Sequence, residues 1–191
     1  MSKSKLKEMR EQAEGYLMRA GLGSYQLMAL EKWGYFEKPA SLHHHLAHKG
    51  GLMEHSINVT DWMLHLKEGM GCASLKPQNI FRIGMLHDLC KCLCYTWDKK
   101  TRKFVWSQPT LTGHGSASVI MAATELGIAL EPDEALAIAW HMGAFGLDKD
   151  GLARYDAALK AYPREILLTH TADMMASHVT EREVQGYAQG K

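Results

Sequence analysis

The chain has 191 residues, with 22 lysines and arginines against 21 aspartates and glutamates, which leaves a formal charge of +1. This length fits one domain, expected to span residues 1–191, and it allows roughly two thirds of the unfolded surface to be buried. Because the charge is close to zero, there is no overall basic surface of the kind that captures long nucleic acids.

The N-terminal residues and the cysteines indicate a soluble protein of the cytoplasm. Residues 1–14 are charged throughout and lack the apolar segment of a signal peptide, and no run approaches the roughly eighteen apolar residues of a membrane span. The four cysteines form no Cys-x-x-Cys pair, which favours reduced thiols packed in the core over a zinc site: Cys72, Cys90, Cys92 and Cys94. We therefore expect no membrane partner.

The first forty residues predict two helices that precede the main core. A charged helix is expected over residues 3–18, ended by Gly21, and Ser24 then begins a short helix that ends near Trp33. Residues 1–40 are accordingly interpreted as an N-terminal helical extension.

Two longer helices are expected at the centre of the molecule. Apolar residues recur at helical spacing over residues 52–67, which places His55 in the first turns of that helix. Residues 78–95 are apolar on most sides, which predicts a single buried helix that carries His87, Asp88 and Lys91.

The remaining chain predicts a hairpin followed by further helices. Residues 95–106 have two aromatic segments around a charged tip, a pattern typical of a β-hairpin. Helices are expected over residues 114–126, 132–141, 152–162 and 164–179, and the polar tail after Glu183 is expected to fray. The predicted fold class is all-α with one small β-hairpin.

Residues of metal-binding types recur at wide intervals along these helices: His55, His87, Asp88, His114, His141 and Asp173. An unpaired carboxylate inside an apolar helix costs several kcal/mol, so Asp88 needs a cation or a dense set of hydrogen-bond donors. A hydrogen-bonded Asp–His pair in the core is the structural alternative, and the other four positions weigh against it. Imidazole-rich coordination suits Mn, Fe, Co, Ni or Zn better than Mg.

The segments around these residues resemble the HD-domain metal-dependent phosphohydrolases. Gly-Gly-Leu-Met-Glu-His ends at His55, Leu-His-Asp-Leu-Cys-Lys contains His87 and Asp88, and His-Thr-Ala-Asp contains Asp173. The resemblance covers residues 41–178, which are expected to form the helical HD core. Together with Gly-His-Gly and Trp-His-Met-Gly, these motifs are similar to a small phage- and prophage-associated branch of the family.

The resemblance implies a site for one or two divalent transition metal ions. One ion would be held by His55, His87, Asp88 and Asp173, and a second by His114 and His141, with Asp88 shared between the two. Metal ions of this kind activate water and hold phosphate oxygens for attack. Asp88 and Lys91 are the expected catalytic residues.

Lys91 and His45 are the candidate substrate contacts, and each has an alternative. Lys91 lies one helical turn from Asp88, where the family pattern places a lysine that contacts phosphate, but a solvent-exposed lysine is the plain alternative. His45 could contact substrate or donate a proton, while the neighbouring His43 and His44 are expected in a solvated loop with one member near the site.

The remaining histidines and the basic hairpin tip each have a structural interpretation. His170 is expected either to orient Asp173 or to pack, and His65 and His178 to be ordinary surface or packing residues. The basic hairpin tip could hold a nucleic acid strand beside its aromatics, but a solubilising turn is favoured: Lys99, Lys100, Arg102 and Lys103.

These residues, together with what the resemblance implies, predict a phosphohydrolase that uses a metal-activated water on a phosphate ester of a nucleotide or short oligonucleotide, as a phosphomonoesterase or phosphodiesterase. The alternatives are a catalytically silent nucleotide- or partner-binding regulatory module and, among enzymes, a single-strand nuclease. Met142 and Gly143 follow His141 where exoribonuclease-like relatives often have a second histidine. The Gly-Tyr-Pro motif that marks the cyclic-di-GMP branch of the family does not occur in the sequence. We therefore expect a small phosphorylated substrate or a short nucleic acid.

Overall fold

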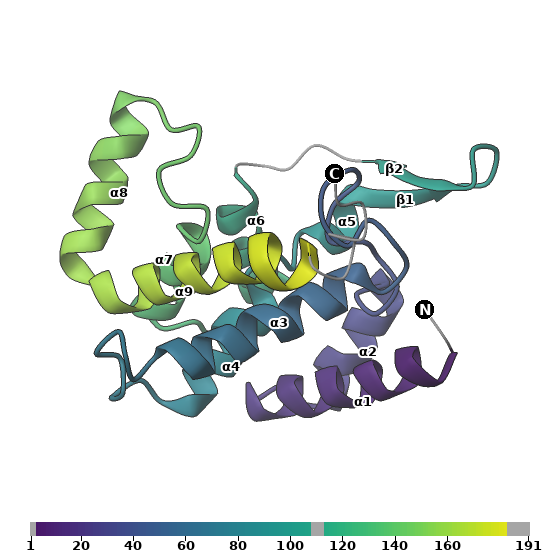
Figure 1. Cartoon of the computed structure of the whole chain (residues 1–191), viewed down its shortest axis with the longest axis horizontal. Helices are drawn as coiled ribbons and strands as arrows, with labels where there is room; N and C mark the ends of the chain where they lie inside the picture. The colour runs from purple at the N-terminus through teal and green to yellow at the C-terminus, as the bar shows by residue number, and fades with distance from the viewer. Residues whose placement is uncertain (1–2, 108–112, 183–191) are drawn as a thin grey trace, which may run out of the picture.

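A computed structural model describes residues 3–107 and 113–182, and it confirms an all-α fold with one β-hairpin (Figure 1). The elements are α1 (Lys3–Arg19), α2 (Ser24–Trp33), α3 (Gly51–Leu66), α4 (Pro77–Leu86), α5 (Lys91–Cys94), β1 (Tyr95–Asp98), β2 (Lys103–Trp106), α6 (His114–Thr124), α7 (Pro132–Ala139), α8 (Lys149–Ala161), α9 (Pro163–Met175) and the π-helical turn η1 (Ala176–Thr180). The tail predicted to fray lies outside the described residues. None of the described helices is long and apolar enough to cross a membrane.

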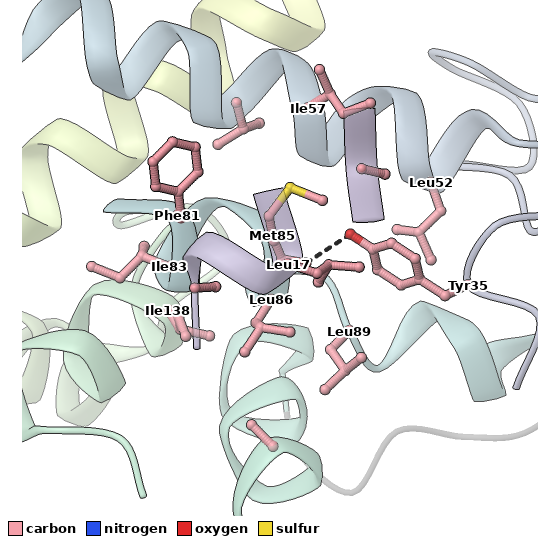
Figure 2. Packing of buried hydrophobic residues seen from close by; sticks show 14 of the residues in the cluster. Leu17, Tyr35, Leu52, Ile57, Phe81, Ile83, Met85, Leu86, Leu89 and Ile138 are labelled. Atoms are coloured by element: carbon pink, nitrogen blue, oxygen red, sulfur yellow. Dashed lines mark hydrogen bonds between the residues drawn. The ribbon is translucent and has the colours of Figure 1, made fainter. Parts of the chain in front are cut away.

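Helix α3 lies at the centre, packed against α4 on one side and α9 on another (Figure 1). The hydrophobic core draws on α1 through Leu17, on α3 through Leu52, on α4 through Ile83 and on α7 through Ile138 (Figure 2). The two-helix N-terminal segment therefore shares a core with the helices that carry the candidate metal ligands. All four cysteines are buried and none forms a disulfide within the described residues, as expected for packing thiols.

The prediction of one helix over residues 78–95 was wrong, because α4 ends at Leu86. The buried Tyr35 hydroxyl donates to the Met85 carbonyl at 2.8 Å, which a continuing helix would have used for the amide of Leu89 (Figure 2). That amide bonds to Leu86 instead, and the Cys90 amide donates to Ser118 Oγ at 3.1 Å. Two side chains distant in sequence thus replace helical hydrogen bonds and leave residues 87–90 in tight turns.

The predicted hairpin is confirmed, and in its register Tyr95 lies opposite Trp106 and Trp97 opposite Phe104. The rings of these pairs lie 5.6 and 5.0 Å apart, and Phe104 packs against the core. At the tip, the Asp98 carboxylate accepts from the Lys100 amide, which closes the turn. These contacts support the interpretation of the tip as a structural turn.

Helices α3 and α4 approach each other closely where Gly84 faces Thr60. A Cβ on Gly84 would lie 2.9 Å from the Thr60 Cα and closer still to its hydroxyl, so any side chain there would force the helices apart. His55 lies five residues before Thr60 on α3, and His87 lies three residues after Gly84. The small residue therefore permits the close approach of the two segments that carry these histidines.

We predict that Gly84→Ala lowers the free energy of unfolding by roughly 1–3 kcal/mol, because the added methyl overpacks the interface between α3 and α4. Gly15→Ala is the matched control, since a Cβ at Gly15 in α1 meets nothing within 4 Å. That change should raise stability by roughly 0.5–1 kcal/mol through helix propensity. Urea denaturation of the two variants measures both effects, and a Gly84→Ala protein as stable as the wild type would contradict the packing argument.

Candidate metal centre

Four separate segments bring the predicted ligands to one place. His55 lies in the first turns of α3, as expected, and Asp173 lies near the end of α9, which runs alongside α3 (Figure 1). His87 and Asp88 occupy the tight turn after α4, and His141 occupies a turn after α7. These five residues are buried, with exposed fractions from 0% to 9%.

The ligand atoms converge around one oxygen of Asp88 and the Nε2 atoms of two histidines. The Nε2 atoms of His55 and His87 lie 3.1 Å apart, and each is within 3.5 Å of Asp88 Oδ2. Asp173 Oδ1 lies 3.2 Å from His55 Nε2, and His141 Nε2 lies 3.7 Å from Asp88 Oδ1. Five of the six predicted metal ligands are therefore in contact within one buried cluster.

Each of the three buried histidines uses its Nδ1 atom in a hydrogen bond that leaves Nε2 facing the cluster. His87 Nδ1 donates to the Gly84 carbonyl at 2.8 Å, and His141 Nδ1 donates to the Ile138 carbonyl at 2.7 Å. His55 Nδ1 donates to a carboxylate oxygen of Glu181 at 2.8 Å. Such hydrogen bonds fix the ring orientation and the tautomer that a metal ion requires.

The Asp88 carboxylate provides the test of whether a cation fits. Its Oδ1 atom is buried and has no hydrogen-bond partner among the described residues. An unsatisfied buried carboxylate oxygen is costly in a folded protein. Ligand atoms of His55, His87 and Asp88 all lie within 4.8 Å of one another, and this mixture of imidazole and carboxylate suits a divalent transition metal ion. The residues present therefore fit such an ion.

Electrostatic interactions keep both carboxylates of the cluster ionised. Burial opposes ionisation of Asp88, but Lys91 and His87 hold its pKa well below the usual range. Burial opposes ionisation of Asp173 also, but its hydrogen bond with His55 lowers its pKa. Burial and the neighbouring His87 lower the pKa of His141 to about 4, so that ring is neutral at physiological pH.

His55 has the opposite shift. Burial lowers its pKa, but Asp173 and Glu181 on its two sides raise the value to about 10. Without a metal ion, the ring therefore carries protons toward both carboxylates, and an ion bound at Nε2 replaces one of these protons.

His114, the sixth predicted ligand, stands apart from the buried cluster. It is the first residue of α6, its ring centre lies 6.3 Å from that of His141, and it lines the cavity above the cluster. His114 is absent from the groups of ligand atoms that lie within 4.8 Å of one another among the described residues. The second ion therefore remains a prediction.

Lys91 is mostly buried, so the alternative of a solvent-exposed lysine was wrong. Its Nζ atom lies 2.5 Å from Asp88 Oδ2, and only 12% of its side chain is exposed. Burial lowers the pKa of Lys91, but the adjacent Asp88 carboxylate raises it, so the ammonium is charged. The side chain also lines the cavity, where a phosphate group could reach it.

A cavity of about 960 Å³ opens above the buried cluster, within the size range of ligand pockets. Asp88 and Asp173 lie on its surface, and Lys91 and Arg182 supply its positive charges. Histidines outside the buried cluster contribute a large share of the wall: His43, His44, His45, His114, His170 and His178. Apolar side chains form another part of the wall: Met142, Ala144, Phe145 and Met174.

Several histidines differ from their predicted positions. His43, His44 and His45 all line the cavity, where one member of the loop was expected, and His178 also lines it rather than being an ordinary surface residue. His170 Nδ1 donates to the His141 carbonyl at 2.7 Å, so this histidine supports His141 and makes no hydrogen bond to Asp173 among the described contacts. His65 is exposed, as predicted.

Glu181 is the residue of the site that sequence reasoning missed. Its side chain is completely buried and contacts both His55 and His45, although the predicted core ended at residue 178. Glu181 lies after the π-helical turn η1 and outside the segments that carry the recognised motifs, so only the structure connects it to the site.

Comparison with protein families gives one match, the HD domain, over residues 52–176. Neither the comparison with curated proteins nor that with solved structures gave a match. The matched range contains all six predicted metal ligands and Lys91, and it does not distinguish the phage-associated branch from others. Because it covers more than half of the chain, the protein belongs to the HD domain family, which consists generally of metal-dependent hydrolases.

Proposed function

We propose that this protein is a metal-dependent phosphohydrolase that hydrolyses a phosphate ester of a nucleotide or short oligonucleotide. One observation carries the proposal: the unpartnered Oδ1 atom of Asp88 lies among histidines that present Nε2, below a cavity lined by Lys91. Such a centre has the residues to bind a divalent cation and a charged group that can meet a phosphate.

The metal ion, Mn, Fe, Co, Ni or Zn, would be held by His55, His87, Asp88 and Asp173. When bound, such an ion lowers the pKa of a coordinated water and stabilises charge on phosphate oxygens. The protein residues hold and orient the reactants. Lys91 fixes the Asp88 carboxylate and presents its charge to the cavity, where it can neutralise a phosphate oxygen. His141, beside Asp88 Oδ1, and His114 at the cavity wall are the residues available for a second ion.

The apolar wall of the cavity supports a substrate with an organic group such as a nucleobase. Phe145 is 83% exposed, and Met142 and Met174 are 40% and 43% exposed. Single exposed apolar residues are common on protein surfaces, but these three line the same cavity as Asp173. A nucleobase could stack on Phe145 while its phosphate lies over the metal centre.

The loop that carries Phe145 is fixed to the metal centre. Gly143 has φ of 65°, and a Cβ there would lie 2.8 Å from the ring of His170, so glycine permits the close contact. His170 in turn donates to the His141 carbonyl. The backbone two residues before Phe145 therefore packs against a residue that supports His141.

A regulatory module without catalysis is the second candidate, and one contact favours it. The Lys91 ammonium partly neutralises Asp88, so the fold has a cation beside this carboxylate without a metal ion. Metal content and turnover distinguish the two candidates.

We predict that the wild-type protein binds up to two transition metal ions per chain and that Asp88→Ala abolishes binding, because Asp88 lies between both groups of ligands. His141→Ala should lose part of the metal, and Lys91→Ala should retain it while turnover falls by roughly 10²-fold. His65→Ala, on the exposed side of α3, is the control. Elemental analysis measures the content, and a wild-type protein that takes up no metal would refute the proposal.

We predict that Phe145→Ala raises KM for a nucleoside monophosphate by roughly tenfold, since stacking on an aromatic side chain contributes about 1–3 kcal/mol per base. Ribose 5-phosphate, which lacks the base, should show no such change. Leu152→Ala on α8 is the control, because Leu152 is also an exposed apolar residue and lies outside the cavity lining. Steady-state kinetics with Mn, Fe, Co, Ni and Mg gives the comparison, and an equal rise in KM for both substrates would argue against a base at this wall.

A further inference from the structure

Glu181 lies beyond the HD domain match and yet contacts the centre of the site. Its carboxylate accepts from His55 Nδ1 at 2.8 Å and from Asn58 Nδ2 at 3.1 Å on one oxygen, and from His45 Nδ1 on the other. The side chain is 0% exposed. A completely buried carboxylate is tolerated only when donors surround it, and these three side chains supply the donors.

The charge of this carboxylate is maintained in the buried position. Burial raises the pKa of Glu181, but the hydrogen bonds from His45 and His55 lower it below its ordinary value. Glu181 therefore meets both histidines as a carboxylate, an acceptor that can receive two N–H groups at once.

The π-helical turn η1 explains why residue 181 reaches this position. In an α-helix, the residue seven places after Asp173 shares its face, and that residue is Thr180. A π turn adds one residue to the helical turn, so Glu181 takes this place instead. Thr180 is turned toward α3, where its hydroxyl accepts from Trp62 Nε1 at 2.9 Å, which fixes the altered register.

The three side chains His45, His55 and Glu181 could themselves hold a metal ion, because their ligand atoms lie within 4.8 Å of one another. His55 weighs against this reading. An ion at its Nδ1 and another at Nε2 would require the ring to lose both protons, whereas the Nδ1–H bond to Glu181 leaves Nε2 available for the buried cluster. The group is better explained as a support for the metal centre.

We propose that Glu181 is a positioning residue with two functions. One oxygen holds His55 in the orientation that presents Nε2 to the metal ion, and the other holds His45 at the wall of the substrate cavity. The first function rests on the proposed metal centre. The second joins the loop that contains His45 to that centre through a single buried carboxylate, so the segment after α9 completes a site whose ligands lie in the HD domain.

The two functions separate in the variants. Glu181→Ala removes both contacts, Glu181→Gln keeps the shape and an acceptor oxygen but loses the charge, and His45→Ala removes only the contact at the cavity. Glu134→Gln is the matched control, because Glu134 is also 0% exposed and lies in α7, paired with Arg82 at 3.0 Å. It tests whether any change at a buried glutamate weakens metal binding.

The experiment is a competition titration of Co²⁺ between the full-length protein and a chelator, together with the visible absorption spectrum of the Co²⁺ form. Glu181→Ala should bind Co²⁺ roughly 10- to 100-fold more weakly than the wild type, as found when the hydrogen-bond partner of a metal-binding histidine is removed. Glu181→Gln should lose less affinity, and its spectrum should differ from that of the wild type. His45→Ala and Glu134→Gln should bind as the wild type does.

Three results would overturn the proposal. The first is wild-type affinity for Co²⁺ in both Glu181 variants. The second is a loss of Co²⁺ affinity in Glu134→Gln as large as that in Glu181→Gln. The third is a loss of Co²⁺ affinity in His45→Ala equal to that in Glu181→Ala. If Glu181→Ala does not fold, the isosteric Glu181→Gln variant and its spectrum decide the question. The titration needs no substrate. A wild-type protein that binds no Co²⁺ or other metal refutes the proposed function as well, whereas unchanged Glu181 variants of a metal-binding protein refute only the positioning role.

Discussion

The ending of α4 at Leu86 is the constraint on which the metal centre depends. Tyr35 occupies the Met85 carbonyl, and Ser118 accepts the Cys90 amide, so the chain leaves the helix just where His87 and Asp88 occur. His87 keeps helical dihedral angles in this turn, with φ of −56° and ψ of −35°, and the Leu89 amide bonds to the Leu86 carbonyl. His87 Nε2 and Asp88 Oδ2 lie 3.4 Å apart there. The close approach of α3 at Gly84 then brings His55 into contact with both.

The composition of the site was predictable because ligand chemistry restricts residue types, whereas its detailed shape was not. His55, His87, Asp88 and Asp173 were identified from their types and motifs, and the structure places them together. The predicted end of the helix over residues 78–95 was wrong, because Tyr35 and Ser118 act through tertiary contacts that have no signal in the local sequence pattern. Glu181 was missed for a related reason, since a π turn breaks the periodicity from which faces of helices are predicted.

The cavity above the buried cluster has walls of mixed character. Its polar wall is rich in imidazole and has Lys91 and Arg182 as its positively charged groups, while Phe145 and Met174 form an apolar wall beside Asp173. Under the proposed function, few fixed positive charges favour a substrate with one or two phosphates over a long strand, because binding of polymers depends on many cationic contacts. The hairpin tip, whose charges lie on a closed structural turn, adds no evidence for a polymer site.

The central claim is that Asp88 and the Nε2 atoms of the buried histidines hold a transition metal ion. X-ray absorption spectroscopy of the metal-loaded protein tests this most directly, because imidazole ligands give a characteristic multiple-scattering pattern. The account predicts nitrogen and oxygen neighbours at about 2.0–2.2 Å with imidazole scattering, which decreases in a His87→Ala protein. A spectrum with oxygen neighbours alone, unchanged in that variant, would contradict it.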